Sequence, residues 1–400
     1  MKPSLTLLAL ALFALPAEGW AKTLSVSTGP DAQERLQTAL IEAQPGDVVA
    51  IGAGRFDLTE GLSLDVNGVT VRGEGTEATI LSFKDQRTAG EGLLVTADDV
   101  VLTGFAVEDS KGDGIKSKGA DRIVYYNLRV EWTGGPKTTN GSYGVYPVAS
   151  SDVLIDHVTV RGASDAGIYV GQSRNIIVRN SVAMYNVAGI EIENCYHADV
   201  YQNLAMHNTG GILVFDLPNL PQMGGHDIRI FANRSSKNDT PNFAPKGNIV
   251  ASVPVGTGVL VMANRAVVIF QNILEENQTA NVMLIAYPNP FNDPRYNPLP
   301  RAVTVRDNIY GRAGWAPALV DDVATQSALG AGALPVLWDG ASDPSAPIRV
   351  TDGGVLSLGL TSAAEGVAAA KPAPADLSKG KAMAEPRRVV LPQSMEALVR

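Results

Sequence analysis

The sequence predicts an all-β fold in which the chain coils as a single-stranded parallel β-helix with three strands per turn, closed at its start by a capping helix. The prediction rests on a glycine that recurs at a fixed step, on a second recurring position between these glycines, and on short apolar runs of period two. The glycines that open β-type runs are Gly114, Gly144, Gly167, Gly189, Gly211 and Gly258, and the steps from Gly144 to Gly211 are 23, 22 and 22 residues. The second position is occupied by Gly104, Asn127, His157, Asn180, Asn203, Asn233 and Asn272.

Each repeat unit contains three short runs, which in one unit are centred on Ile168–Val170, Ile176–Val178 and Val182–Met184. Apolar and polar residues alternate in these runs, which indicates strands with one buried face. Their connections are too short for a helical crossover, so equivalent strands of successive turns must stack in parallel about 4.8 Å apart. The recurring Asn suits a tight turn and can hydrogen-bond along the stack. A β-propeller needs blades of about 40 residues, which excludes that fold.

The N-terminal segment is expected to close the open end of the coil, whose strand edges would otherwise be exposed. Residues Asp31–Ala43 predict a helix, because Leu36, Ala39, Leu40 and Ala43 fall on one face and Pro45–Asp47 end it. The strand Val48–Ile51 follows directly.

The two ends of the chain differ from the repeat region. Residues 1–21 have the pattern of a signal peptide, with cleavage near Ala21, and this predicts a periplasmic or secreted protein. The β-helix domain is expected over 22–311, and a C-terminal extension that packs on it over 312–361. Residues 362–400 are rich in Ala and Pro and predict a flexible tail, of which 389–400 can dock on the body.

Composition excludes several classes of partner and site. The net charge of −9 argues against nucleic-acid binding, which needs clustered Lys and Arg. The single cysteine, Cys195, excludes internal disulfides and any multi-cysteine metal site. Beyond the signal peptide, no segment is apolar and long enough to span a membrane.

Particular segments resemble a known family. Residues 43–51, Gly54–Phe56 and Val69–Gly75 are similar to the entry segment of exported right-handed parallel β-helix proteins of the pectate-lyase-like superfamily, and the resemblance covers about 31–310. The two repeats resemble β-helix repeat proteins akin to the periplasmic nitrous-oxide-reductase maturation factor. This resemblance implies a right-handed coil, a polysaccharide or oligosaccharide ligand, or a periplasmic protein partner such as a c-type cytochrome. The catalytic motifs of polygalacturonases and alginate epimerases are not present, so no catalytic residue is carried over.

Long insertions mark where a ligand would bind. The repeat is enlarged at 131–143, 216–227, 236–257 and 287–301, on the two borders of the strand that begins with the recurring glycine. Long loops in a compact domain are commonly functional, and two such walls would border a groove. If Ile115, Val145, Ile168, Ile190 and Ile212 point inward, their neighbours floor this groove. The outward row then contains Lys116, Tyr146, Tyr169, Glu191 and Leu213, and the next row Lys118, Val148, Gly171, Glu193 and Phe215.

These rows supply the candidate site residues. Lys116, Tyr169 and Glu191 are the predicted catalytic residues, and the predicted substrate-binding residues are Lys118, Tyr146, Glu193 and Phe215. From Lys116 to Glu191 is about 14 Å, the length of a few sugar rings. Either tyrosine, Tyr146 or Tyr169, paired with Lys116 would act as base and acid. The Glu191–Glu193 pair, about 7 Å apart, suits inverting glycoside hydrolysis or, with added ligands, calcium. Each residue alone is also an ordinary one for an exposed sheet.

A metal site formed by the soft ligands is not favoured. His197, His207 and His226 lie at different repeat positions from Cys195 and from each other, so one shared copper site is not expected. The leading hypothesis is therefore an exported β-helix that binds, and as a further step processes, a polysaccharide by lyase, hydrolase or epimerase chemistry. The alternative is a non-enzymatic periplasmic scaffold or accessory protein for a redox or metal-handling partner.

Overall fold

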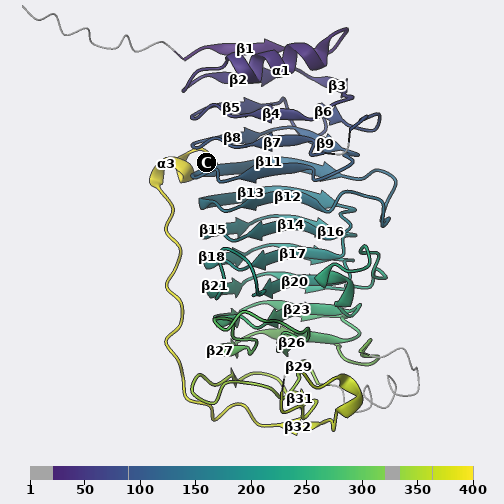
Figure 1. Ribbon diagram of the computed structural model, residues 1–400, viewed down its shortest axis with the longest axis vertical. Coiled ribbons are helices and arrows are strands. Elements are labelled where there is room, and N and C mark those ends of the chain that lie inside the picture. Colours follow the sequence, from purple (N-terminus) through teal and green to yellow (C-terminus); the bar gives the residue numbers. More distant parts are fainter. Residues whose placement is uncertain (1–20, 89, 320–333, 363, 400) are drawn as a thin grey trace, which may run out of the picture.

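The chain winds around one long axis, and equivalent strands of successive turns stack on one another (Figure 1). This computed structural model describes residues 21–88, 90–319, 334–362 and 364–399. The predicted signal peptide, apart from Ala21, lies outside the described residues. None of the helices in these ranges is long and apolar enough to cross a membrane.

One stack is a 12-stranded sheet, which we call the Gly-led sheet because its central strands contain the recurring glycines. Its last strand pairs antiparallel with the one before it, and the strands before that pair in parallel. In order along the axis these strands are β4 (Leu62–Leu64), β7 (Leu93–Val95), β10 (Ile115–Lys118), β12 (Tyr143–Val148), β14 (Ala166–Gly171), β17 (Ala188–Glu193), β20 (Gly210–Phe215), β23 (Thr257–Met262), β26 (Ala280–Ile285), β29 (Val336–Trp338), β31 (Val355–Ser357) and β32 (Ala373–Ala375).

The other two strand positions of each turn form a 20-stranded sheet, the long sheet. Its first column contains β1 (Thr23–Val26), β2 (Val48–Ile51), β5 (Thr70–Arg72), β8 (Val101–Thr103), β11 (Ile123–Glu131), β13 (Ser151–Arg161), β15 (Arg174–Arg179), β18 (Tyr196–Tyr201), β21 (His226–Phe231), β24 (Arg265–Phe270), β27 (Arg301–Arg306) and β30 (Arg349–Val350). Its second column contains β3 (Gly54–Asp57), β6 (Thr79–Ser82), β9 (Ala106–Glu108), β16 (Val182–Met184), β19 (Leu204–Met206), β22 (Arg234–Ser236), β25 (Ile273–Glu275) and β28 (Ile309–Tyr310). Strands β11 and β13 are long enough to belong to both columns.

The core runs along the axis inside the coil. The predicted inward residues, Ile115, Val145, Ile168, Ile190 and Ile212, are all 0% exposed and belong to one continuous cluster. Each fully buried aliphatic side chain contributes about 1.5–3 kcal/mol. The alternation in the sequence therefore fixes which face of every strand points inward.

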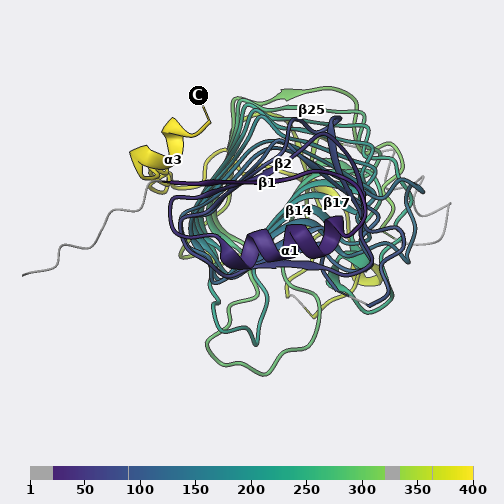
Figure 2. The same ribbon diagram turned by 90° about the horizontal axis from the view of Figure 1, so that it is seen from above.

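The first turn is closed by helix α1 (Ala32–Glu42), which lies across the open end of the coil (Figure 2). Leu36, Ala39 and Leu40 are buried on its inner face and join the axial core. The predicted capping helix is confirmed. It covers apolar side chains of the first turn that would otherwise face water.

Asparagine ladders tie the turns together. The backbone N–H of Asn203 donates to Oδ1 of Asn233 at 3.0 Å, and the N–H of Asn233 donates in the same way to Asn272 at 3.0 Å. Because Val182 pairs with Leu204, the residue opposite Asn203 is Ser181 and not Asn180. The sequence alignment of the second recurring position therefore merged residues from two adjacent structural positions. One takes left-handed backbone angles, as Asn180 does with φ 51°, and the next forms the ladder.

A second ladder lies at another corner, three residues before the recurring glycines of two turns. Its members are buried and are, in order, Asn186, Asn208, Asn238 and Asn277. The backbone N–H of each of the first three donates to the Oδ1 of the next member. Sequence analysis missed this ladder, although the spacing Asn186–Gly189 and Asn208–Gly211 signals it.

The coil continues beyond the predicted domain boundary at 311. Strands β29, β30 and β31 add to the two sheets, so residues 336–357 extend the helix rather than pack on it as a separate extension. The Asn ladder also continues, because Asn308 donates to the carboxylate of Asp352. Asp takes the Asn position there, and the repeat is therefore not recognised in the sequence.

The last residues differ from the flexible tail expected for 362–400. Residues 381–399, the C-terminal strap, run back along the outside of the coil and end in helix α3 (Gln393–Ala397) near β11 and β13 (Figure 1). Two short 3-10 helices, Ile249–Ser252 and Val367–Ala369, complete the secondary structure of the described residues.

Apolar contacts and ion pairs hold the strap. Its buried residues pack on outward residues of the long sheet, in a cluster formed by Val389, Leu391, Met395, Val101, Val124, Leu154 and Ile177. Arg306 pairs with Glu385 at 2.7 Å, and Arg179 with Glu396 at 2.9 Å. The composition of the strap predicted disorder because its apolar residues are few. These few residues are nevertheless buried, because a row of outward apolar residues on the long sheet packs against them.

We predict that Met395→Ala loosens the strap and that Val390→Ala does not. Met395 is 3% exposed and Val390 is 80% exposed. Losing the buried side chain removes about 2 kcal/mol of docking free energy, whereas an exposed substitution changes it by less than about 0.5 kcal/mol. Hydrogen exchange of the amides at 389–395 measures the opening. Equal protection in the two variants would contradict the observed docking.

Candidate active site

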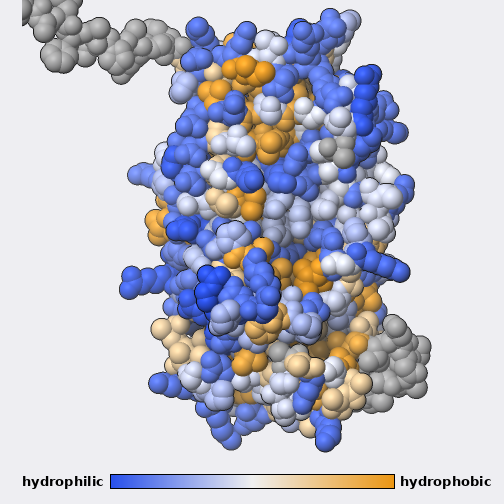
Figure 3. All heavy atoms as spheres, viewed as in Figure 1, coloured by the Kyte–Doolittle hydropathy of each residue, from blue (hydrophilic) through white to orange (hydrophobic). Residues whose placement is uncertain are grey.

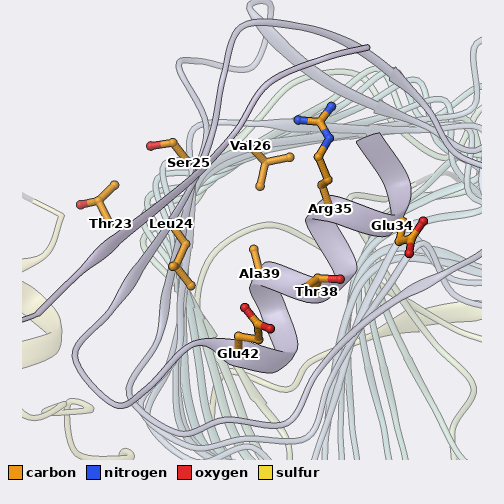
Figure 4. A pocket seen from close by; sticks show the side chains of 9 residues that line it. All are labelled: Thr23, Leu24, Ser25, Val26, Glu34, Arg35, Thr38, Ala39 and Glu42. Carbon is orange, nitrogen blue, oxygen red and sulfur yellow. The ribbon is translucent and has the colours of Figure 1, made fainter. Parts of the chain in front are cut away.

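Four long loops border the Gly-led sheet where the insertions predicted them. Loops 131–143 and 236–257 precede β12 and β23, and loops 216–227 and 287–301 follow β20 and β26. The hollow in Figure 4 is a different feature, since it lies between β1 and α1 at the capped end of the coil. The face drawn in Figure 3 is mostly hydrophilic, with separate apolar patches.

The predicted outward row lies side by side on the Gly-led sheet. Lys116 pairs in register with Tyr146, and Tyr169 pairs with Glu191. Rings from two turns come together, with centroid distances of 4.8 Å between Tyr146 and Tyr169 and 4.4 Å between Tyr143 and Tyr169. Tyr143 and Tyr146 are half-buried, so this tyrosine cluster presents aromatic surface to solvent.

Lys116 lies at the edge of the cluster as a paired cation. Its Nζ atom is 3.0 Å from Glu91 and 3.2 Å from Asp113, and 4.8 Å from the centre of the Tyr146 ring. Burial alone would lower the pKa of Lys116, but the hydrogen bonds and charges of the two acids outweigh burial and raise it. The predicted role of Lys116 in proton transfer therefore does not suit its surroundings, because a lysine with two acidic partners holds its proton.

The side chain of Tyr169 extends over Gly171 of its own strand, β14, and reaches Glu193 on the neighbouring strand, β17. Its Oη donates to Glu193 Oε1 at 2.6 Å. Gly171 lies opposite Glu193 in the register, and a Cβ at Gly171 would lie 2.6 Å from the Tyr169 ring. The absence of a side chain at 171 thus gives the ring its path to the carboxylate. Burial and the nearby carboxylates raise the pKa of Tyr169, so its hydroxyl stays protonated at neutral pH.

Three buried carboxyl groups lie beside the tyrosines: Asp165, Glu191 and Glu193, which we call the carboxyl cluster. Glu191 is 1% exposed and Glu193 is 7% exposed, and Asp165 is also buried. Burial is the main cause that raises the pKa of Asp165 and of Glu193, each to about 7. Burial, followed by the charges of Asp165 and Glu193, raises the pKa of Glu191 well above its ordinary value. The cluster therefore holds and exchanges protons near neutral pH.

The loop 236–257 covers this cluster. Asn248 Nδ2 donates to Asp165 Oδ2 at 2.8 Å, and Val253 packs with Leu213 in the apolar cluster that also contains Tyr169. Glu191 Oε2 is buried without a hydrogen-bond partner among the described residues. A buried polar atom without a partner is costly, and it is a feature of sites that bind or react.

Of the two remaining predicted substrate-binding residues, Lys118 lies in the row that the alternation assigned to it, whereas Phe215 is covered. Phe215 is 1% exposed and packs with Leu260, Met262 and Tyr296 in an apolar cluster, so it cannot contact a ligand as it stands. Loops 236–257 and 287–301 close over that part of the sheet, which sequence alternation does not reveal. Lys118 is exposed and lies opposite Val148, one row away from the tyrosines.

Sequence analysis missed several members of the site. Asp165 and Tyr143 flank the predicted strands rather than occupying the outward row, and Asn248 and Asp113 lie in connections. The available signal was an acidic residue just upstream of a recurring glycine, with Asp113 one residue before Gly114 and Asp165 two residues before Gly167.

The histidines and carboxylates do not form a metal centre in the part of the chain that the structure describes, where no group of three or more His, Cys, Asp or Glu is arranged to hold a metal ion. His197 contacts Asn175, His207 contacts Asp239 and His226 contacts the carbonyl of Gly224.

Comparisons with known proteins support the fold. The family model for right-handed β-helix regions matches residues 67–221. The chain folds as a right-handed parallel β-helix. This β-helix is similar to the A-module of mannuronan C-5 epimerase AlgE4 from Azotobacter vinelandii, with a TM-score of 0.52 and 13% identity over 84% of this chain and 94% of that one.

A second similar structure is the N-terminal fragment of gene product 12 of bacteriophage Phi29. The TM-score is 0.51 and the identity 10%, over 83% of this β-helix and 61% of that fragment. The sequence matches no curated protein. At these identities the likeness shows the fold alone.

We predict that the carboxyl cluster makes the protein less stable as the pH rises from about 4 to about 7. The folded-state pKa values of Asp165 and Glu193, about 7, lie above the ordinary values of 3.8 and 4.5. The folded state thus binds more protons in this window, so the free energy of unfolding falls with rising pH. Urea unfolding at several pH values measures the slope.

Glu193→Gln should reduce that slope by about one proton equivalent, because it removes one titrating group. Glu275→Gln is the matched control, since Glu275 is partly exposed and pairs with Arg234. An unchanged slope in Glu193→Gln would contradict the raised pKa of Glu193.

Proposed function

We propose that the protein binds a polysaccharide across the Gly-led sheet and hydrolyses it with the carboxyl cluster. The observation that carries the proposal is the set of three buried carboxyl groups beside the tyrosine cluster, with the pKa values of Asp165 and Glu193 raised to about 7 and that of Glu191 raised well above its ordinary value. Perturbed carboxyl groups beside a binding surface are typical of acid–base sites.

The tyrosine cluster supplies the binding surface. Tyr143 and Tyr146 are half-buried, so their rings can pack on the apolar faces of sugar rings while their hydroxyls hydrogen-bond. Loops 131–143 and 236–257 form a border on the side where these strands begin. A polymer is favoured over a single sugar because the row from Lys116 to Glu191 spans about 14 Å.

The carboxyl cluster supplies proton transfer. Glu191, whose pKa is raised well above its ordinary value by burial, is the proposed general acid that protonates the glycosidic oxygen. Glu193, whose pKa is about 7, is the proposed general base that takes a proton from the attacking water. Two residues apart on one strand face, they are separated by about 7 Å, which suits inversion at the anomeric carbon. Lyase and epimerase chemistry is less favoured, because Lys116 and Tyr169 both retain their protons.

Substrate access requires movement of loop 236–257. The Asn248–Asp165 hydrogen bond is its polar contact with the cluster, and exchanging it for contacts with substrate would open the site. We also propose that the protein is exported to the periplasm or secreted, as residues 1–21 predict. The substrate then lies outside the cytoplasm.

The test is turnover of uronic-acid and neutral polysaccharides by the mature protein. We expect Glu191→Gln and Glu193→Gln each to lower kcat by about 10²–10⁴, because each removes a proton-transfer group. Glu275→Gln is the control and should retain full activity. Tyr146→Ala should weaken binding by about tenfold with a smaller effect on kcat.

The near-complete burial of Glu191 favours a second candidate, a non-enzymatic periplasmic scaffold or accessory protein for a redox or metal-handling partner such as a c-type cytochrome. That candidate is supported if no glycan binds or turns over, and if shortening loop 216–227 or 287–301 abolishes capture of periplasmic proteins while Glu191→Gln does not.

A further inference from the structure

A basic hollow lies at the corner where the chain turns from the long sheet into the Gly-led sheet. It has a volume of about 510 Å³ and is lined on one side by Lys84, Lys111 and Lys137. Asp109 is the only acidic residue that lines it, in a protein of net charge −9. This lysine hollow is separate from the carboxyl cluster.

The lysines come from three successive turns. Three strand ends pair in register, at Ser82, Glu108 and Glu131. Each lysine follows one of these strand ends: Lys84 after Ser82, Lys111 after Glu108, and Lys137 in loop 131–143 after Glu131. All three line the same hollow, so their positive charges are gathered at one corner of the coil. Like charges that share a hollow repel one another, and an anion bound among them relieves that repulsion.

No carboxylate neutralises these lysines among the residues that the structure describes. None of the three forms an ion pair there, and Lys111 Nζ donates only to the carbonyl of Arg87, at 3.3 Å. Asp109 is occupied, because its two oxygens accept hydrogen bonds from the N–H and the hydroxyl of Thr133, each at 2.7 Å. The positive charge of the hollow is therefore available to a ligand.

The walls of the hollow are held in place by buried contacts. Trp132 is buried and its Nε1 donates to the carbonyl of Ser110 at 2.8 Å, which joins loop 131–143 to the preceding turn. Asn140 Nδ2 donates to the carbonyls of Gly135 and Gly162 at 2.9 and 2.7 Å. A hollow framed in this way binds an ion with little ordering cost.

We propose that the lysine hollow binds a tetrahedral oxyanion, a phosphate or sulfate ester group carried by an acidic polymer. Three ammonium groups act as separate point charges around a compact tetrahedral oxyanion, whereas planar carboxylates are matched better by arginine. The Thr139 hydroxyl lines the same hollow and adds a neutral donor. The inference stands whether or not the carboxyl cluster is catalytic, because it depends on binding alone.

The test is calorimetric titration of the mature protein with inorganic phosphate, inorganic sulfate, glucose 6-phosphate, glucose 6-sulfate and glucuronate at low salt. We expect one site for the tetrahedral oxyanions, phosphate and sulfate and their two esters, and at least tenfold weaker binding of the planar carboxylate of glucuronate. The two esters identify which source of oxyanion is preferred. Glucuronate binding as tightly as both esters would overturn the oxyanion assignment.

The variant Lys84→Gln/Lys111→Gln/Lys137→Gln should lose binding by about tenfold for each lysine removed. Its matched control is Lys237→Gln/Lys371→Gln/Lys381→Gln, which removes the same charge from exposed positions elsewhere. Equal loss in both triple variants would show a net-charge effect and overturn the site. Tyr146→Ala separates this proposal from the proposed hydrolase, since it should leave phosphate and sulfate binding unchanged.

Discussion

The whole structure depends on the register between successive turns. Every inward aliphatic residue of the Gly-led sheet meets its counterpart one turn away, and the Asn ladders repeat the same register through hydrogen bonds of about 3 Å. A slip of one residue would turn the buried face of a strand outward. Apolar burial thus selects the register, and the buried amides make any other register costly because their donors and acceptors would lose their partners.

The same register creates the electrostatics of the candidate site. The register places Tyr169 beside Glu191, and Gly171 opposite Glu193. Because Gly171 has no side chain, the hydroxyl of Tyr169 reaches the carboxylate of Glu193. Loop 236–257 then removes water from these groups. The carboxyl cluster has no cation of its own, since Lys116 is paired with Glu91 and Asp113. Protons rather than cations therefore neutralise it, and its pKa values rise.

The sequence predicts the parts of this structure that repeat. Period-two alternation assigned Ile168 and Ile190 to the core and Tyr169 and Glu191 to one outer row, because each strand obeys the same local geometry. The capping helix was predictable for the same kind of reason, from one apolar face and a stop signal. The resemblance to pectate-lyase-like proteins added the hand of the coil.

What does not repeat could not be predicted. The path of loop 236–257 depends on tertiary contacts such as those of Val253 and Asn248, so the burial of Glu191 and Phe215 was missed. Asp165 was missed because it precedes its strand. The sequence indicated that 389–400 can dock, but not where, because composition does not report the apolar row of the long sheet on which Val389 and Met395 pack.

The most direct test of the account is a carbon-13 NMR titration of the side-chain carboxyl groups, assigned with Asp165→Asn, Glu191→Gln and Glu193→Gln. The account predicts that Asp165 and Glu193 titrate near pH 7 and that Glu191 titrates well above its ordinary value. Titration of all three groups near their ordinary values, 3.8 and 4.5, would show that the stacked turns do not bury them together and would contradict the account.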